Sequence, residues 1–149
     1  MDYQHVLLAT DLSEYSSTTA QRAYDISKSN AAKLSMMHVV EAASAIYAGE
    51  FSPPVHFDLE EEVEKSARTQ LAELASQYHV PADRQYVCNG RVRYAIIELA
   101  KQIKADLIVI GTHNYSGLEM LLGTTASAVL HHAKCDVLVV RQNSTEEEA

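Results

Sequence analysis

Short runs of apolar residues recur along the 149-residue chain, and each run ends at a polar or turn-forming residue. Strands in the middle of a parallel sheet are buried on both faces, so they read as continuous apolar runs rather than as alternating positions. The runs therefore predict five buried parallel strands, at His5–Thr10, Lys33–Val40, Arg84–Cys88, Asp106–Ile110 and Asp136–Val140.

Between these runs, apolar positions spaced three and four residues apart predict helices. The clearest helix spans Asp58–Tyr78, and its acidic first turn suits the positive end of a helix. Further helices are expected after Ser13, after Asn89–Gly90 and over Thr124–Ala133. Residues 41–57 have no clean periodicity, and a loop of that length inside a compact domain is usually functional or mobile.

Strands that alternate with helices form right-handed βαβ units around one parallel sheet. The predicted fold class is therefore α/β, a doubly wound open sheet of five parallel strands with helices on both faces. The length favours one domain, which we expect over residues 1–143, followed by an acidic tail over residues 144–149.

The charge balance narrows the choice of partners. With 12 basic and 20 acidic residues the net charge is −8, which argues against nucleic acid and against an anionic membrane surface as partners. Small anions are not excluded, because backbone amides can hold them. The sequence has no apolar run of about 18 residues and no signal-peptide pattern, so we expect no membrane span and a cytoplasmic location. Cys88 and Cys135 fit no zinc spacing, and we expect two reduced, buried thiols.

In an open α/β sheet, ligands bind beyond the carboxyl ends of the strands, where neighbouring connections diverge. If the first and fourth strands are those neighbours, residues 11–13 and 111–123 line the crevice. Gly111 permits a close backbone approach or a positive φ, and Gly123-Thr124-Thr125 opens a helix whose free amides favour an anion. The same residues also fit a simpler interpretation, with two turn glycines and an N-cap threonine. The pattern alone leaves both interpretations open.

The sequence does not show the residue patterns typical of a serine hydrolase or of a histidine metal site. There is no G-x-S-x-G nucleophile elbow, and no base can be assigned to any serine. The adjacent His131 and His132 cannot both face one metal ion on a helix. We therefore expect no catalytic residues and no dedicated metal site.

Several longer motifs occur together, namely HVLLATDLSEYS, LSMMHVVE, NGRVRYAIIELA, DLIVIGTHNYSG and CDVLVV. In this combination the chain resembles the universal stress protein family over essentially its whole length. The resemblance implies a Rossmann-like fold of the adenine nucleotide alpha hydrolase type, with sheet order 3-2-1-4-5. It also implies a homodimer formed through the last strand, Asp136 to Val140.

Many members of that family bind ATP through an aspartate after the first strand, a position ending the second strand, and a loop written G-x2-G-x9-G-S/T. Carried over to this chain, the implied nucleotide-binding residues are Asp11, Val39, Gly111, Asn114, Gly123, Thr124 and Thr125. The chain departs from this loop: Asn114 replaces the second glycine, and eight residues rather than nine separate it from Gly123. These departures resemble the branch typified by universal stress protein A, which generally does not bind ATP.

Two hypotheses for the function follow from this resemblance. The first is a cytoplasmic stress-response protein that acts without catalysis, through homodimerisation and contacts with protein partners. The alternative is an ATP-binding nucleotide switch, with Mg²⁺ arriving on the phosphates and with slow hydrolysis or autophosphorylation as variants. The altered glycine loop favours the first hypothesis.

Overall fold

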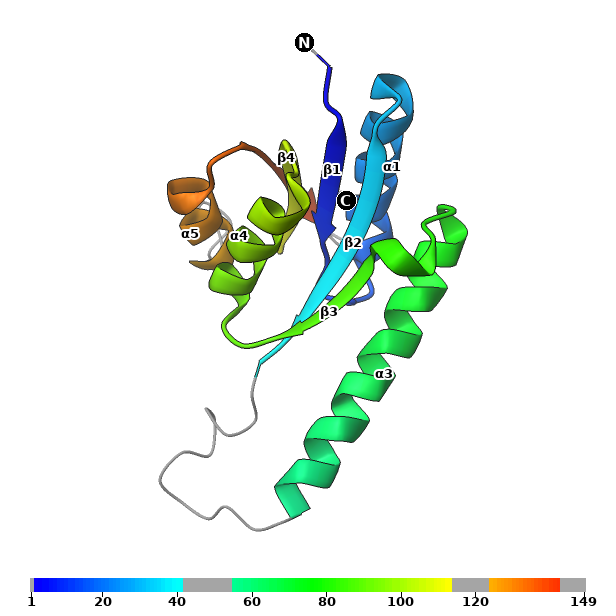
Figure 1. The fold of residues 1–149 in the computed structure, drawn as a ribbon, viewed down its shortest axis with the longest axis vertical. Coiled ribbons are helices and arrows are strands. Elements are labelled where there is room, and N and C mark those ends of the chain that lie inside the picture. The colour runs from blue at the N-terminus through cyan, green and yellow to red at the C-terminus, as the bar shows by residue number, and fades with distance from the viewer. Residues whose placement is uncertain (1, 42–54, 114–123, 143–149) are drawn as a thin grey trace, which may run out of the picture.

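The computed structural model describes residues 2–41, 55–113 and 124–142. Its centre is a single sheet of five parallel strands in the order β3-β2-β1-β4-β5 (Figure 1). The strands are β1 (His5–Ala9), β2 (Lys33–Val40), β3 (Gln85–Asn89), β4 (Leu107–His113) and β5 (Asp136–Gln142). The predicted α/β class and the sheet order 3-2-1-4-5 are both confirmed.

Helices cover both faces of this sheet (Figure 1). They are α1 (Ser16–Asn30), α3 (Val55–Gln77), α4 (Val92–Ile103) and α5 (Thr124–His132), and a short 3-10 helix, η1, spans Ala82–Arg84. Helices α1 and α3 pack on one face, and α4 and α5 pack on the other. The arrangement is the doubly wound one, in which helices shield both faces of a parallel sheet from solvent.

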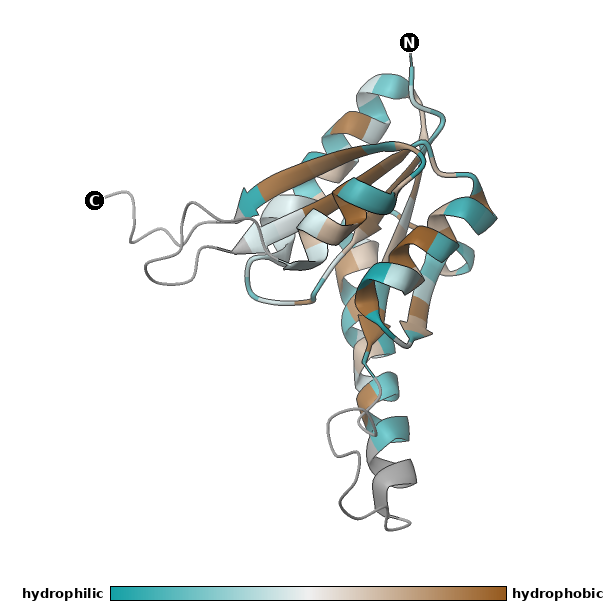
Figure 2. Cartoon of the chain, turned by 90° about the vertical axis from the view of Figure 1, so that its left-hand side faces the viewer, coloured by the Kyte–Doolittle hydropathy of each residue, from teal (hydrophilic) through white to brown (hydrophobic). Residues whose placement is uncertain are grey.

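The apolar runs of the sequence become the central layer of the molecule. In Figure 2 the strands are hydrophobic for most of their length, whereas the helices alternate hydrophobic and hydrophilic residues. Successive strand residues point to opposite faces, so Met36 contributes to the core under α1 and α3, and Met37 to the core under α4 and α5. Both methionines are fully buried, as continuous apolar runs require.

The helices bury the faces that their spacing predicts, with two exceptions. Leu71 of α3 is 1% exposed and Ile96 of α4 is 1% exposed, each against its own side of the sheet. Val63 and Leu130, which the same periodicity places inward, are 45% and 43% exposed. Those two predictions are wrong. Val63 precedes the buried stretch of α3, which begins at Ala67, and Leu130 follows the fully buried Val129, so its side chain points about 100° away around the helix.

Several element boundaries also differ from the prediction. Strand β4 continues to His113, and β5 continues to Gln142, because the two strands pair along their full length in register. Helix α3 begins at Val55, inside the segment predicted to be a loop; residues 42–54 of that segment lie outside the described residues. The third strand begins at Gln85, because Arg84 belongs to the 3-10 turn after Pro81.

The two cysteines are free, as expected, but they are half-buried rather than buried. Cys88 lies on β3, and β3 is an edge strand with one neighbour. Cys135 immediately precedes β5, which is the other edge strand. A side chain near an edge lacks the flanking strand that would complete its burial.

Candidate functional site

The direction of the chain connections changes between β1 and β4. These strands are parallel neighbours, with Val6–Ala9 of β1 opposite Leu107–Ile110 of β4. The chain leaves β1 toward α1 on one face, and it reaches α5 on the opposite face after β4. The order β3-β2-β1-β4-β5 thus places the switch point of the sheet here, where α/β folds bind ligands.

The loop that follows β1 is held by its own polar side chains. The Thr10 hydroxyl oxygen accepts a hydrogen bond from the Leu12 N–H at 3.0 Å, and Asp11 Oδ1 accepts one from the Ser13 N–H at 3.0 Å. Ser13 Oγ in turn accepts the Tyr15 N–H at 3.2 Å. Leu12 adopts a φ of 58°, which lets the chain turn sharply. The exposed Asp11 carboxylate therefore lies beyond the carboxyl end of β1 and accepts a hydrogen bond from its own loop.

His38 adds a further restraint that sequence reasoning missed. Its Nδ1 lies 2.8 Å from the Thr10 carbonyl oxygen, and because a carbonyl only accepts, Nδ1 must carry the proton. This bond ties the end of β1 to β2 one residue before Asp11. The available signal in the sequence was a histidine inside the mostly apolar run of β2.

The strand register brings three of the predicted site residues to one edge. Met37 of β2, Ala9 of β1 and Ile110 of β4 form one row across the sheet. Val39 and Asp11 each lie two residues beyond that row, and Gly111 lies one residue beyond it. Val39 is 9% exposed and pairs with Cys88 on β3. Its backbone is therefore within the sheet, next to the carboxyl edge.

Gly111 does not form the turn that the sequence suggests. It lies inside β4 opposite Val140, and Gly90 is the glycine with positive φ in the described part of the chain. Strand β4 continues for two residues past Gly111, through Thr112 and His113, because β5 extends alongside it. Gly111 is thus a strand position at the carboxyl end of β4, and of the two roles expected for it, a close backbone approach or a positive φ, the positive φ is wrong.

The remaining predicted residues belong to the segment after β4. Thr124 is exposed and Thr125 is half-buried at the first turn of α5. A helix that leaves the carboxyl end of a parallel strand begins at that edge, so both threonines lie on the crevice side of the sheet. Asn114 and Gly123 lie outside the described residues.

The strand β3 side of this edge carries basic residues. Gly90, with a φ of 124°, turns the chain from β3 into α4, and its N–H donates to the Val40 carbonyl at 3.2 Å. Arg91 and Arg93 are exposed just after it. The Arg93 guanidinium lies 4.9 Å from the centre of the Tyr94 ring. A hydrogen bond from Arg93 to the phenol oxygen, with its positive charge, lowers the pKa of Tyr94.

Hydrolytic chemistry has no support in the described geometry. A serine–histidine hydrogen bond does exist, from Ser35 Oγ to His5 Nε2 at 2.7 Å, but it lies at the amino end of the sheet. Ser35 is fully buried there, so no substrate can reach it. Within residues 2–41, 55–113 and 124–142, no three His, Cys, Asp or Glu side chains group as metal ligands. No helix in these ranges is long and apolar enough to cross a membrane.

Comparison with known proteins decides the family. The sequence profile of the universal stress protein family matches residues 2–141. The chain belongs to the universal stress protein family. It is also 46% identical over 140 residues to universal stress protein A homolog 1 of Coxiella burnetii, covering 94% of this chain and 97% of the relative. Homolog 2 of the same organism is 36% identical over 141 residues, with 94% and 96% covered. As a member of this family, the chain is a stress-response protein.

Solved structures of family members share the fold. Universal stress protein UspA from Lactobacillus plantarum superposes with a TM-score of 0.70 at 24% identity, covering 95% of this chain and 99% of that one. A universal stress protein in complex with cAMP superposes with a TM-score of 0.64 at 24% identity, with the same two coverages. At these identities the likeness establishes the fold, a Rossmann-like open sheet, and one such fold holds a nucleotide.

Proposed function

We propose that this family member is a cytoplasmic stress-response protein that acts without catalysis, by forming homodimers and presenting a surface to protein partners. The interface is the last strand, Asp136 to Val140. The observation that carries this proposal is the position of β5 at an edge of the sheet.

An edge strand presents backbone N–H and C=O groups on its outer side that no neighbouring strand satisfies. On β5 these groups accompany half-buried apolar side chains, Val137, Leu138 and Val139. Pairing two copies of β5 about a two-fold axis satisfies both β5 edges with one contact, and the closed dimer leaves no β5 edge open for further association. The strand is thus suited to a dimer and, left unpaired, is an aggregation risk.

The test is the mass of the particle in solution, measured by sedimentation velocity over a range of protein concentrations. We expect a dimer for the natural chain and a monomer for Leu138→Lys, because two like charges then face each other near the axis. Val87→Lys is the matched control: Val87 is also half-buried against the same core, but on the opposite edge strand β3.

Both lysine variants disturb the same core, so a general loss of folding affects them alike and shows in their circular dichroism. A dimer lost in Leu138→Lys and kept in Val87→Lys supports the interface. A natural chain that sediments as a monomer, or a dimer that both variants dissociate equally, contradicts it.

A second candidate function is nucleotide binding at the crevice between β1 and β4. Its support is the position of Asp11, Val39 and Gly111 at the carboxyl end of neighbouring strands at the switch point, together with the related fold that holds cAMP. In this proposal Asp11 and Val39 hold the base and sugar side of ATP, and Gly111, Asn114, Gly123, Thr124 and Thr125 hold the phosphates. Mg²⁺ would arrive with the phosphates.

Calorimetric titration of MgATP, and separately of cAMP, tests this second function. Micromolar binding that Asp11→Ala or Gly123→Val removes, and that Glu14→Ala keeps, supports the nucleotide switch. Glu14 is the control because it is an exposed acid in the same loop. No heat at millimolar nucleotide in a folded dimer contradicts nucleotide binding and leaves the dimer proposal intact.

A further inference from the structure

A hollow unrelated to the crevice lies at the amino end of the sheet. It is bounded by the last turns of α4, by the start of β4 and by the residues that lead from α5 into β5. Its volume is about 110 Å³. Because all five strands run in one direction, this position is at the opposite end of the sheet from the crevice between β1 and β4.

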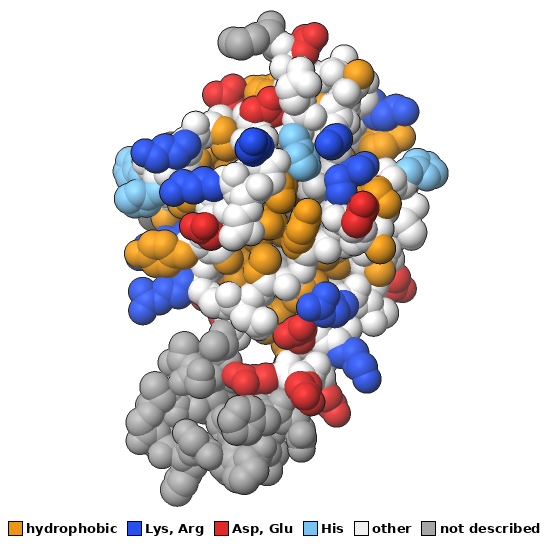
Figure 3. All heavy atoms as spheres, viewed as in Figure 1, with side chains coloured by type: hydrophobic (Ala, Val, Ile, Leu, Met, Phe, Trp, Pro, Cys, Tyr) orange, Lys and Arg blue, Asp and Glu red, His pale blue; other side chains and the backbone are white. Residues whose placement is uncertain are grey.

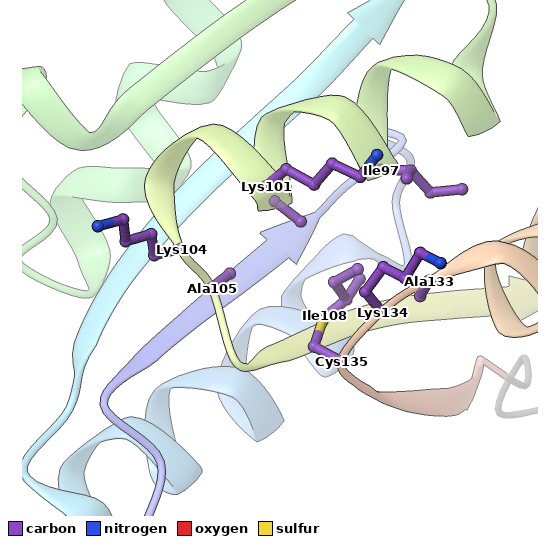
Figure 4. Close-up of a pocket in the computed structure, with 9 residues that line it drawn as sticks. Ile97, Lys101, Lys104, Ala105, Ile108, Ala133, Lys134 and Cys135 are labelled. Atoms are coloured by element: carbon purple, nitrogen blue, oxygen red, sulfur yellow. The ribbon is translucent and has the colours of Figure 1, made fainter.

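The inner wall of this α4–α5 pocket is apolar. Its lining comprises Ala100, Ala105, Ile108, Ala133 and Cys135, together with Ile97 on α4. Ile108 is fully buried, so it forms the floor, and Figure 4 shows the Cys135 sulfur beside it. Burial, reinforced by the carboxylates of Asp136 and Asp106, raises the pKa of Cys135, so its thiol is neutral at pH 7. The wall therefore favours an uncharged, apolar group.

The rim of the pocket is positively charged. Lys101, Lys104 and Lys134 complete the lining, and the lining includes no carboxylate. Figure 4 shows Lys101 and Lys134 extending in the same direction along the two sides of the pocket, whereas Lys104 extends the other way. In Figure 3 Lys and Arg side chains are spread over both sides of the visible face, so the rim differs from its surroundings by having three lysines and no carboxylate in the lining. In a chain with net charge −8, the rim is a local positive surface.

The lysine charges have no direct partner within the described residues, where the ion pair present is Arg68–Glu64. Glu98, an exposed acid three residues before Lys101 on α4, lies outside the pocket lining and forms no ion pair with Lys101 among the described residues. The acids nearest in sequence to Lys104 and Lys134 are engaged on other groups. Asp106 accepts the backbone N–H of Gln4 at 2.8 Å and that of His5 at 3.0 Å, and Asp136 accepts the Tyr3 hydroxyl at 2.8 Å. An anion at the rim would meet cations that no carboxylate of the described residues pairs with directly.

The ends of the helices give a reason for these lysines that needs no ligand. Lys101 lies in the last turn of α4, and cations there suit the negative end of a helix. That role explains the charges, but it does not explain an apolar hollow between them. It also makes a different prediction, since removing a lysine would then lower helix stability and leave ligand binding unaffected.

We propose that the α4–α5 pocket binds a small monocarboxylate with an apolar body of about four to six carbons, its carboxylate between Lys101 and Lys134. The size follows from comparison with apolar cavities of about 150 Å³, which take up benzene. The pocket, at about 110 Å³, holds a slightly smaller body. A dicarboxylate or a nucleotide does not suit it, because the inner wall is apolar and Lys104, the third lysine of the lining, extends away from the other two.

The test uses acetate, butyrate and hexanoate as probes, titrated into ¹⁵N-labelled full-length protein and followed by backbone amide shifts. We expect shifts confined to residues 97–108 and 133–137. Affinity should rise roughly fourfold for each methylene that enters the apolar wall. Hexanol and hexylammonium share the apolar body and should bind more weakly than hexanoate, with the ammonium weakest.

Three variants separate the contributions. Lys101→Met with Lys134→Met should weaken hexanoate binding about fivefold and leave hexanol unchanged. Lys28→Met with Lys65→Met removes the same charge from α1 and α3, on the other face, and should change neither. Ala133→Leu fills the pocket and should abolish the dependence on chain length.

Acetate binding as tightly as hexanoate, or hexanol binding as tightly as hexanoate, overturns the proposal. So do shifts spread over the whole surface. A rim double variant that binds hexanoate normally but unfolds at lower urea also overturns it, and assigns the lysines to the helix ends alone. Nucleotide titration does not bear on this result, because the two sites lie at opposite ends of the sheet.

Discussion

Replacing Gly90 with alanine tests the backbone geometry of the turn between β3 and α4. Gly90 has a φ of 124°, a conformation that residues with a side chain rarely adopt, and no atom lies within 4 Å of the position a Cβ would take. The substitution therefore adds backbone strain and no steric clash. It also keeps the N–H that donates to the Val40 carbonyl.

The magnitude follows from two opposing effects. Holding a non-glycine residue in such a region costs about 1–3 kcal/mol. Alanine also lowers the conformational entropy of the unfolded chain, which stabilises the folded state by about 0.4–1 kcal/mol. The net expectation for Gly90→Ala is a loss of about 1–2 kcal/mol in the free energy of unfolding, and each kcal/mol corresponds to about 2–4 °C in Tm for a chain of this length.

Ala31→Gly is the matched control, because it makes the reverse exchange at another positive φ. Ala31 ends α1 with a φ of 54°, a position where glycine is the usual residue. Relief of the left-handed strain, about 1 kcal/mol, is offset by the added freedom of the unfolded chain, so this variant should be neutral or slightly more stable. Urea unfolding followed by circular dichroism measures both. A Gly90→Ala variant as stable as the natural chain would refute the reasoning.

Three further predictions concern stability. Burial lowers the pKa of His5 below 6.5, so the unfolded chain binds a proton at a higher pH than the folded chain does. The free energy of unfolding therefore declines as the pH falls below about 6.5, until the pKa of the folded state is reached. In His5→Gln the urea midpoint should change less between about pH 7.5 and about pH 5.5. Asp106→Ala removes the acceptor of the Gln4 and His5 N–H groups and should cost about 1–3 kcal/mol in urea unfolding, whereas Asp106→Asn, which retains an acceptor oxygen, should cost less. Leu71→Ala should cost about 2–5 kcal/mol by the same assay, and Val63→Ala less than about 0.5 kcal/mol, because their side chains are 1% and 45% exposed; equal losses would contradict the assigned face of α3.

The central fold could be predicted from sequence because burial on both faces leaves a plain signature. A run such as Leu34–Val40 is apolar nearly throughout, and the structure buries all of its members but one. Strand ends could not be predicted in the same way. In the sequence, Gly111 predicts the end of a strand. Strand β4 nevertheless continues through it to His113, because β5 pairs with the two residues that follow Gly111. A strand's end depends on its neighbour, and that neighbour is distant in sequence.

The candidate site was predictable only in part, for a similar reason. Asp11 was identifiable as a polar residue directly after a buried strand, and it follows β1 by two residues, as Val39 lies two residues beyond Met37, the partner of Ala9. The contribution of His38 depends on a cross-strand hydrogen bond to Thr10, which no local pattern contains. The α4–α5 pocket was equally inaccessible, because Lys101 and Lys134 are 33 positions apart and meet only through helix packing.

The two proposed sites also show what the net charge does and does not exclude. A charge of −8 opposes a long polyanion, whose binding needs many phosphates neutralised over a broad surface. A small anion senses only the charges within about one Debye length, roughly 8–10 Å. Arg91 and Arg93 are exposed after edge strand β3 at the carboxyl end of the sheet, and at the amino end Lys101 and Lys134 flank an apolar hollow. The net charge is therefore compatible with both proposed anion sites, and the salt dependence of each should be that of a few charges only.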